Sequence, residues 1–223
     1  AIFHTFRGMT QLLRGEVDAM FDGIEPCIQA ASVASSDVHG LVIAYCGAGY
    51  RALNAGAVSV AERMFDAAVT TARDRFVQDF EAYDVAGLAL LEFPRGDWAR
   101  ARLLLLESAV LSADSNIWWI EMQQVGVAIP LALRTGDDEL LASFAREEIV
   151  EAAFRTREPR SYGAIAAAFA ELFAARGDAQ RAGDVLHRAV DAASSIGAAP
   201  GLGLAVARFG HADDLPRVRE LYE

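Results

Sequence analysis

A glycine-rich segment is the first place where this sequence suggests a defined chemistry. The apolar residues 41–46 are followed by Gly47-Ala48-Gly49-Tyr50-Arg51-Ala52, a G-x-G-x-x-A pattern. In dinucleotide-binding proteins this pattern forms a turn between a strand and a helix, and its glycines let the backbone approach a pyrophosphate. If the same turn forms here, Gly47 and Gly49 hold the phosphates of a nucleotide.

Side chains suited to metal binding or catalysis are few and scattered. The histidines stand at four separate positions: His4, His39, His187 and His211. None has another histidine, a cysteine or a carboxylate at the short spacing of a metal site. Cys46 has no base placed to activate it as a nucleophile. The sequence therefore predicts no catalytic residue, no metal, no cofactor and no enzymatic activity.

The charged residues exclude further classes of function. All 20 basic residues are Arg, so no lysine is present to bind a nucleotide phosphate or to form a Schiff base. The net charge is −11, with 31 acidic residues, and the basic surface that nucleic acids require is missing. The carboxylate clusters 137–139, 147–148 and 213–214 are interpreted as acids in the first turns of helices or on solvated faces. We therefore expect no direct contact with nucleic acid.

The sequence also carries predictions about where in the cell the protein lies and whether the chain is part of a longer protein. No apolar run reaches the ~20 residues of a membrane span, and the first residues do not follow the basic, apolar and small-residue order typical of a signal peptide. With two cysteines in 223 residues, a reducing cytoplasm is expected. The chain lacks an initiator Met and stops within a helical pattern, which predicts a segment of a longer protein.

The elements that position these residues are revealed by a recurring glycine. Gly15, Gly56, Gly96, Gly136 and Gly177 are separated by 41, 40, 40 and 41 residues, and Gly210 follows after 33. A fixed period of this size indicates a repeat protein. Repeat proteins usually bind partners along an extended surface, so the period also favours binding over catalysis.

Each repeat is predicted to be a pair of helices on either side of the glycine. Apolar residues recur at helical spacing in 39–54 and 57–73, and again in 77–93 and 97–113. Strand patterns are scarce, so the fold is expected to be all-α. The units run over about 1–35, 36–75, 76–114, 115–156, 157–196 and 197–223, the last one partial.

The residues around the glycine have physical roles in such a turn. A left-handed residue after the first helix costs a side chain ~1 kcal/mol or more, and Gly little. Asp97, Asp137 and Asp178 can then cap the second helix. Positions five after the glycine are small in three units (Ala61, Ala101 and Ala182), with Met20, Leu141 and Leu215 as departures. Positions seven before it are also mostly small, and positions nine after it are mostly large and apolar, as close helix packing requires.

The spacing of the repeats predicts the structure of the glycine-rich segment 47–52. Gly49 occupies the small position seven residues before Gly56, as Gly8, Ala89 and Ala170 do in other units. The segment 47–52 is therefore predicted to lie inside a helix, and a nucleotide-binding turn stays as the minor alternative.

The pattern of a small residue, Gly-Asp, Ala and a large apolar residue resembles the tetratricopeptide motif. That family has a period of 34 residues, so the present helices are expected to be longer by roughly a turn. Repeats of this length resemble the sensor arms of large bacterial LuxR-type transcription regulators, which lie between an ATPase module and a DNA-binding helix-turn-helix. The resemblance implies one domain over 1–223, a right-handed superhelix of antiparallel helical hairpins.

The resemblance also implies a binding surface on the concave face formed by the first helices. The groove residues are then Ile43, Cys46, Tyr50, Leu53, Asn54, Tyr83, Phe93, Gln123 and Arg134, with Trp118 as an aromatic candidate beside them. This lining suits a peptide, a protein helix or a small organic effector. A neighbouring domain covering the same face is an equal alternative, and packing between units is the simpler interpretation of Trp118.

Two functional hypotheses follow. In the first, the chain is an interaction or effector-sensing domain of a cytoplasmic regulator, and ligand binding changes the packing of its units. In the second, it is an assembly scaffold for self-association, including a homodimer, or for partner docking without a small ligand.

Overall fold

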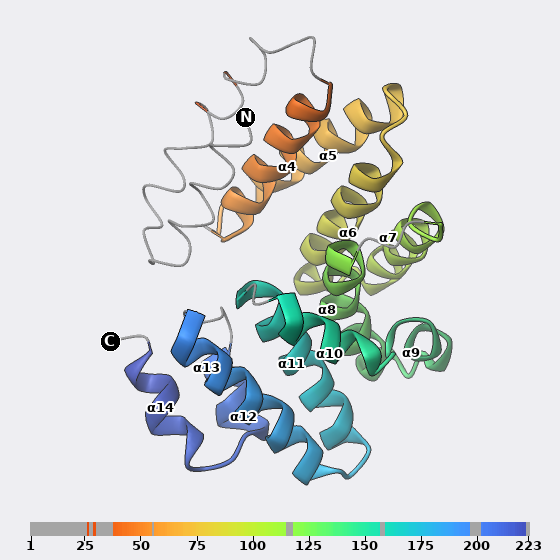
Figure 1. The fold of residues 1–223 in the computed structure, drawn as a ribbon. Coiled ribbons are helices and arrows are strands. Elements are labelled where there is room, and N and C mark those ends of the chain that lie inside the picture. The colour runs from red at the N-terminus through yellow and green to blue at the C-terminus, as the bar shows by residue number, and fades with distance from the viewer. Residues whose placement is uncertain are drawn as a thin grey trace. The chain divides into compact units, whose positions relative to one another are not determined.

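The described part of the chain is entirely helical. The computed structural model describes residues 26, 29, 38–54, 56–114, 118–156, 159–196 and 202–221, and over these residues no strand occurs. This confirms the all-α class predicted from the sequence. The helices, labelled in Figure 1, are α4 (Val38–Asn54), α5 (Val58–Asp74), α6 (Gln78–Arg95), α7 (Trp98–Leu111), α8 (Trp118–Thr135), α9 (Asp138–Phe144), α10 (Glu148–Thr156), α11 (Pro159–Ala175), α12 (Ala179–Ile196), α13 (Leu202–Phe209) and α14 (Asp214–Glu220).

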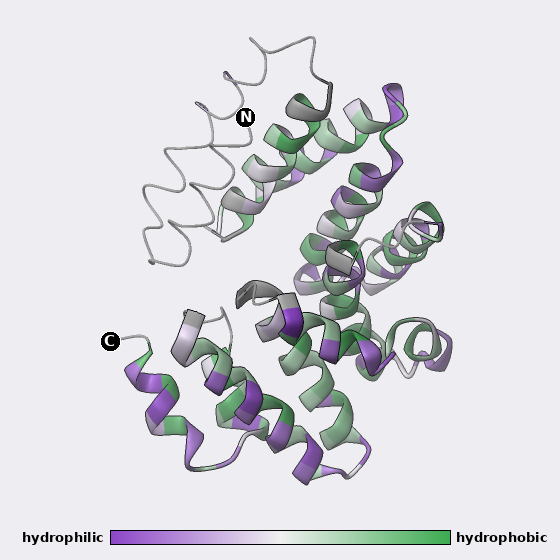
Figure 2. Ribbon diagram, in the orientation of Figure 1, coloured by the Kyte–Doolittle hydropathy of each residue, from purple (hydrophilic) through white to green (hydrophobic). Residues whose placement is uncertain are grey.

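The chain divides into two compact units, Ala1–Ile120 and Glu121–Glu223. In the first unit α5 packs against α4 and α6, and α6 packs against α7. In the second unit α11 packs against α10 and α12, and the C-terminal pair α13 and α14 packs on α12. Figure 2 shows the mostly apolar α11 beside α12, whose outer face is polar.

The recurring glycine forms the predicted turn in four hairpins. Gly56, Gly96, Gly136 and Gly177 have φ values of 74°, 82°, 68° and 81°, all in the left-handed region. In each turn the amide after the glycine donates to the carbonyl five residues earlier, as from Asp97 to Glu92 at 3.2 Å and from Asp178 to Phe173 at 2.9 Å. This hydrogen bond closes the end of the first helix, and only Gly adopts the required backbone at little cost.

Aspartates after three of these glycines cap the second helix, as predicted. The Asp97 carboxylate accepts from the amide of Arg100 at 3.1 Å, that of Asp137 from Leu140 at 2.9 Å, and that of Asp178 from Arg181 at 3.1 Å. Each bond satisfies an amide that has no partner within its own helix.

The cap at Asp97 gives a first testable expectation. Replacing Asp97 by Ala leaves the first amides of α7 to water and is expected to lower the free energy of unfolding by about 0.5–2 kcal/mol. Urea denaturation of the variant measures this loss. Asp97→Ser, which keeps an acceptor oxygen, is expected to recover most of it, and equal losses in both variants would show that the cap contributes nothing.

Small and large side chains meet at the predicted positions. Ala61, Ala101 and Ala182 are buried, and so are the large residues nine positions after the glycines, Phe65, Leu105 and Leu186. The Phe65 ring lies between two glycines: a Cβ added at Gly49 of α4 would lie 2.7 Å from Phe65 Cε1, and one at Gly87 of α6 would lie 2.9 Å from it. The two glycines thus leave the space in which a ring from α5 joins three helices.

Residues 47–52 lie inside α4 and form no strand-to-helix turn. The minor hypothesis of a dinucleotide-binding turn at Gly47 and Gly49 is therefore wrong. Gly49 is needed because the Phe65 ring occupies the space of its missing side chain.

Two predictions about the repeat fail locally. Gly210 is not left-handed, unlike the recurring glycines 56, 96, 136 and 177; a Cβ there would lie 2.8 Å from the Val206 carbonyl oxygen, so close backbone approach is its constraint. The second helix of the fourth unit is not continuous, since α9 ends at Phe144 and α10 begins at Glu148. The break begins at Ala145, where other units place a large anchoring residue.

Predictions that involve Gly8, Gly15, Met20, His4 and unit 1–35 lie outside the described residues. Among the helices that are described, none combines the length and the apolar character needed to cross a membrane.

Candidate functional site

The residues of the predicted groove lie in both units, and each set is described within its own unit. In the first unit, Cys46 and Tyr50 are buried, whereas Ile43, Leu53, Tyr83 and Phe93 are half-buried. In the second unit, Gln123 is half-buried, and the exposed Arg134 pairs with Glu171 of α11 at 3.4 Å. The side chains of Asn54 and Trp118 lie outside the described residues.

Contacts bring three of these residues together where α4 meets α6. The Tyr50 and Tyr83 rings have centroids 5.0 Å apart, and the Tyr50 hydroxyl donates to the Tyr83 carbonyl oxygen at 3.4 Å. Phe65 of α5 stands edge-on to Tyr50 at 4.8 Å between centroids. Cys46, one helical turn before Tyr50, lies on the same face of α4. Cys46 and Tyr50 therefore form part of the core between helices, which the prediction of an open groove did not anticipate.

An acidic residue that the sequence analysis did not select lies in this contact. Asp84 of α6 is 0% exposed, and neither of its carboxylate oxygens accepts a hydrogen bond of normal geometry. Burying a charge without a partner costs several kcal/mol, and buried polar atoms without a partner are rare. We call the group formed by Cys46, Tyr50, Tyr83 and Asp84 the Asp84 cluster.

Burial controls the protonation of the Asp84 cluster. It raises the pKa of Asp84 well above its usual range, and a weak interaction with the Cys46 thiol opposes only part of that shift. Burial likewise raises the pKa of Tyr50 well above its usual value, and the neighbouring Tyr83, Cys46 and Asp84 raise it further. Tyr50 is thus a neutral hydrogen-bond donor, and Asp84 is the group whose charge can change.

The repeat register contained a signal for Asp84. The position twelve residues before the left-handed glycine is Ala44, Asp84, Gln124 and Ile165 in the four hairpins, and all four are buried. Asp84 is the one carboxylate among these four residues, since the others are apolar or carry an amide. Aligning the units at this position would have identified Asp84 from the sequence.

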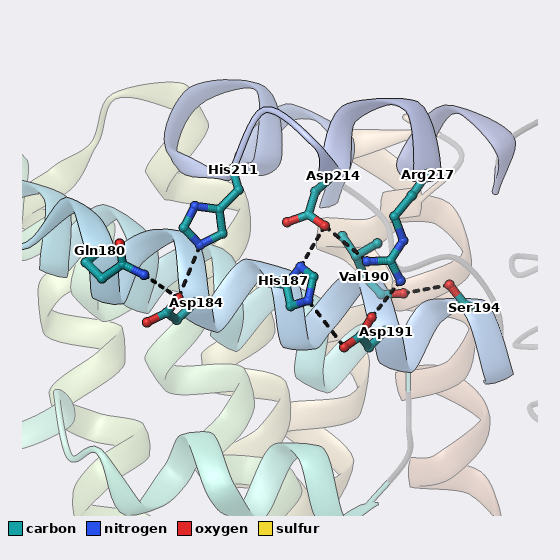
Figure 3. Close-up of polar contacts among 9 residues, drawn as sticks. All are labelled: Gln180, Asp184, His187, Val190, Asp191, Ser194, His211, Asp214 and Arg217. Atoms are coloured by element: carbon teal, nitrogen blue, oxygen red, sulfur yellow. Dashed lines mark hydrogen bonds and ion pairs between the residues drawn. The ribbon is translucent and has the colours of Figure 1, made fainter.

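A second polar group joins α12 to the C-terminal helices, as Figure 3 shows. His187 Nδ1 lies 2.8 Å from Oδ1 of Asp214, and its Nε2 lies 3.7 Å from Asp191. Arg217 contacts both carboxylates, Asp214 at 3.2 Å and Asp191 at 2.6 Å. We call these four residues the C-terminal network.

His211 extends the same surface of α12. Its Nε2 lies 3.2 Å from Asp184, which also accepts from Gln180 at 2.9 Å, and the rings of His187 and His211 are 6.3 Å apart. The fold thus brings together two histidines that looked scattered in the sequence. The signal was local, since Asp184 and Asp191 lie three residues before and four after His187, on its face of the helix.

The C-terminal network has a structural role and not a catalytic one. Both ring nitrogens of His187 face carboxylates, and over the described ranges no cluster of three or more His, Cys, Asp or Glu side chains could hold a metal ion. Asp214 is 1% exposed, whereas His187 and Arg217 are more open to solvent. The network therefore fastens α14 to α12.

Replacing Asp214 by Ala is expected to lower the free energy of unfolding by about 1–2 kcal/mol, because two charge-assisted contacts are lost while their exposed partners regain water. Hydrogen exchange is expected to rise in α13 and α14 more than in α11. The matched control is Asp213→Ala, since Asp213 is exposed and its side chain makes no cap hydrogen bond. Equal effects of the two variants would contradict the fastening role.

A shallow depression lies beside this network, where α11, α12 and α13 meet. It has a volume of about 420 Å³ and is lined by Ala174, Ala179, Gln180, Ala182, Arg208, Phe209, Gly210 and His211. The Arg208 guanidinium stands 5.8 Å from the Phe209 ring, and His211 contacts Asp184. The depression is open to solvent, so it offers a surface and not an enclosed site.

Comparison of the chain with family models, with curated proteins and with solved structures finds no match.

Proposed function

We propose that this chain is a binding domain built from tetratricopeptide-like repeats, which senses an effector or binds a protein partner within a multidomain regulator. The single observation that carries the proposal is the repeated turn. Four hairpins at a period of about 40 residues share a left-handed glycine and the same closing hydrogen bond. Stacked repeats of this kind form extended surfaces suited to binding.

The first helices are the proposed binding surface. In the first unit these are α4 and α6, which carry Ile43, Leu53, Tyr83 and Phe93 as partly accessible apolar or aromatic side chains. Such residues suit the apolar face of a peptide helix or a small organic ligand. A right-handed superhelix of the units is part of the proposal, as is a role without enzymatic activity.

The regulator context comes from the resemblance to LuxR-type sensor arms and from the acidic charge, which disfavours direct contact with nucleic acid. In the proposed mechanism, the ligand binds the first-helix face more tightly in one packing of the units than in another. Its binding then shifts the population of packings and so the state of the attached domains.

A peptide selection tests this proposal. A library of displayed peptides is panned against the whole chain, and the dissociation constants of enriched peptides are measured by calorimetry. Tyr83→Glu on the first-helix face is expected to weaken binding at least about tenfold, since it places a charge in the apolar contact. Leu103→Glu on α7 is the matched control and is expected to leave binding unchanged. Peptides that lose affinity only for the α7 variant would refute the proposed surface.

A specific observation favours the alternative of a self-associating scaffold. One face of α7 carries apolar residues at positions 99, 103, 106 and 110, and Leu103 and Val110 are 65% and 74% exposed. The opposite face, which includes Leu104 and Leu105, is already buried in the hairpin. A second copy of the chain can cover this stripe, because it presents the same apolar residues in return.

Self-association through this stripe predicts a definite mass change. The wild-type chain is expected to form a dimer as its concentration rises from micromolar to millimolar, because pairing removes the stripe from water. Analytical ultracentrifugation measures the mass. The double variant with Leu103→Glu and Val110→Glu is expected to stay monomeric with unchanged helical circular dichroism. A wild-type chain that stays monomeric over the whole range excludes self-association as the scaffold's role.

A further inference from the structure

We infer that the ligand of the first-helix face carries an organic cation, an ammonium group, that pairs with Asp84 between α4 and α6. The inference rests on the proposed function and names the chemistry of its ligand. Its basis is the Asp84 carboxylate, which is 0% exposed and has two oxygens without a hydrogen-bond partner of normal geometry.

The buried carboxylate has no cation of the described chain beside it. The nearby acids of the same unit are paired with arginines: Glu81 with Arg73 at 2.6 Å, and Glu92 with Arg95 at 3.1 Å. Asp84 is distinguished from them by its complete burial without such a partner. The energetic cost of burying this negative charge is removed either when the carboxylate takes up a proton or when a ligand brings a positive group next to it.

The surroundings of Asp84 are suited to an ammonium group. Tyr50 interacts electrostatically with Asp84, and the Tyr50 and Tyr83 ring centroids lie 5.0 Å apart. The face of an aromatic ring attracts a cation within about 6 Å. An ammonium has three N–H donors and no acceptor, and Asp84 supplies two oxygens that need donors. Asp84 is 0% exposed, so water is excluded from the carboxylate, and the low local dielectric strengthens the pairing.

Tyr83 is the member of the Asp84 cluster that a ligand in solution can contact first. It is half-buried, whereas Tyr50 and Asp84 are buried, so Tyr83 is the member of the Asp84 cluster nearest to solvent. A ligand that reaches Asp84 from the first-helix face passes the Tyr83 side chain, which also belongs to the proposed binding face.

Protons and cations compete for Asp84, which gives the inference a distinctive signature. Burial raises the pKa of Asp84 well above its usual range, so the carboxyl group is protonated at low pH and cannot pair with a cation. As the pH rises through the raised pKa, the carboxylate forms and cation binding strengthens. Binding to an exposed carboxylate would change only near its ordinary, lower pKa.

The test uses the full chain and three probes: putrescine, agmatine and the neutral analogue 1,4-butanediol. Thermal unfolding is followed at pH 6 and pH 9, with sodium chloride added to equalise ionic strength. Putrescine is expected to raise the unfolding temperature of the wild-type chain above the sodium chloride control, more at pH 9 than at pH 6. Agmatine, which keeps one ammonium group and carries a guanidinium in place of the other, shows whether a single ammonium group is enough.

Two variants make the result specific. Asp84→Asn is expected to lose the putrescine effect and to bind putrescine at least about tenfold more weakly, as loss of one member of a buried charge pair requires. Glu62→Gln removes a partly exposed carboxylate of the same unit and is expected to keep the effect. Equal shifts in wild type and Asp84→Asn, or no shift beyond sodium chloride with either cation, would overturn the inference.

The outcome also separates this inference from the proposed function. If peptides bind through Tyr83 but no cation effect depends on Asp84, the binding surface stands and its ligand is uncharged. If cations bind through Asp84 and no peptide is selected, the face is a site for small molecules alone.

Discussion

Replacing Phe65 by Ala is expected to lower the free energy of unfolding by about 3–5 kcal/mol, the range observed when a buried aromatic ring is removed from a core. The Phe65 ring is fully buried, with Gly49 on one side and Gly87 on the other. Its loss leaves a cavity that α4, α5 and α6 share. Neither Gly49 nor Gly87 has a side chain that could move into the space. Urea denaturation followed by circular dichroism measures the loss.

Phe76→Ala is the matched control for this prediction. Phe76 has the same side chain but is 93% exposed, so its truncation is expected to change stability by less than about 0.5 kcal/mol. A complementary variant, Gly87→Ala, is expected to be destabilising because its Cβ would lie 2.9 Å from the Phe65 ring. Similar losses for Phe65→Ala and Phe76→Ala would show that the ring does not hold the three helices together.

Asp84→Asn is expected to stabilise the chain increasingly as the pH rises. The folded-state pKa of Asp84 is raised above its unfolded value, so the folded protein retains a proton that the unfolded chain releases. Wild-type stability therefore falls by about 1.4 kcal/mol for each pH unit between the unfolded and the folded pKa, and is constant above the folded pKa. Asn has nearly the same shape and no charge, so the variant lacks this fall.

The measurement is the difference in free energy of unfolding between Asp84→Asn and wild type, taken at intervals from pH 4 to pH 9 without added organic cations. Groups common to both proteins cancel in this difference, which isolates the carboxylate. Glu62→Gln is again the control and is expected to show the opposite sign, because its hydrogen bond with Arg95 lowers the pKa of Glu62. A difference for Asp84→Asn that does not change with pH would mean that Asp84 is ionised or neutral to the same extent in both states.

Features that depend on a few neighbouring residues could be predicted from the sequence. The left-handed glycines, the caps at Asp97 and Asp137, and the buried Ala61 depend on a few neighbouring residues, and a fixed period reveals them. The same register placed Gly49 inside a helix. The failure at Gly210 has a local cause as well, since its environment is set by the Val206 backbone and not by a left-handed turn.

The site was harder to predict because it depends on contacts between helices. Cys46, Tyr50 and Tyr83 were selected as groove residues, but nothing within α4 alone indicates that Tyr50 is buried against α6. The acid at Asp84 looks ordinary when it is considered within its own helix, and it becomes unusual only when the units are compared. The network of His187, Asp191, Asp214 and Arg217 depends on the packing of α14 against α12, which the period of the repeat does not specify.

The shared geometry of the four glycine turns has a consequence for how such a gene can change length. The chain before one of these glycines and the chain after another meet in the same backbone conformation, with the same closing hydrogen bond. An unequal crossover between the codons of Gly96 and Gly136 therefore removes or duplicates one whole period of 40 residues while leaving the turn intact. The shared turn thus lets a whole unit, including the one with Asp84, be gained, lost or exchanged without a new kind of connection.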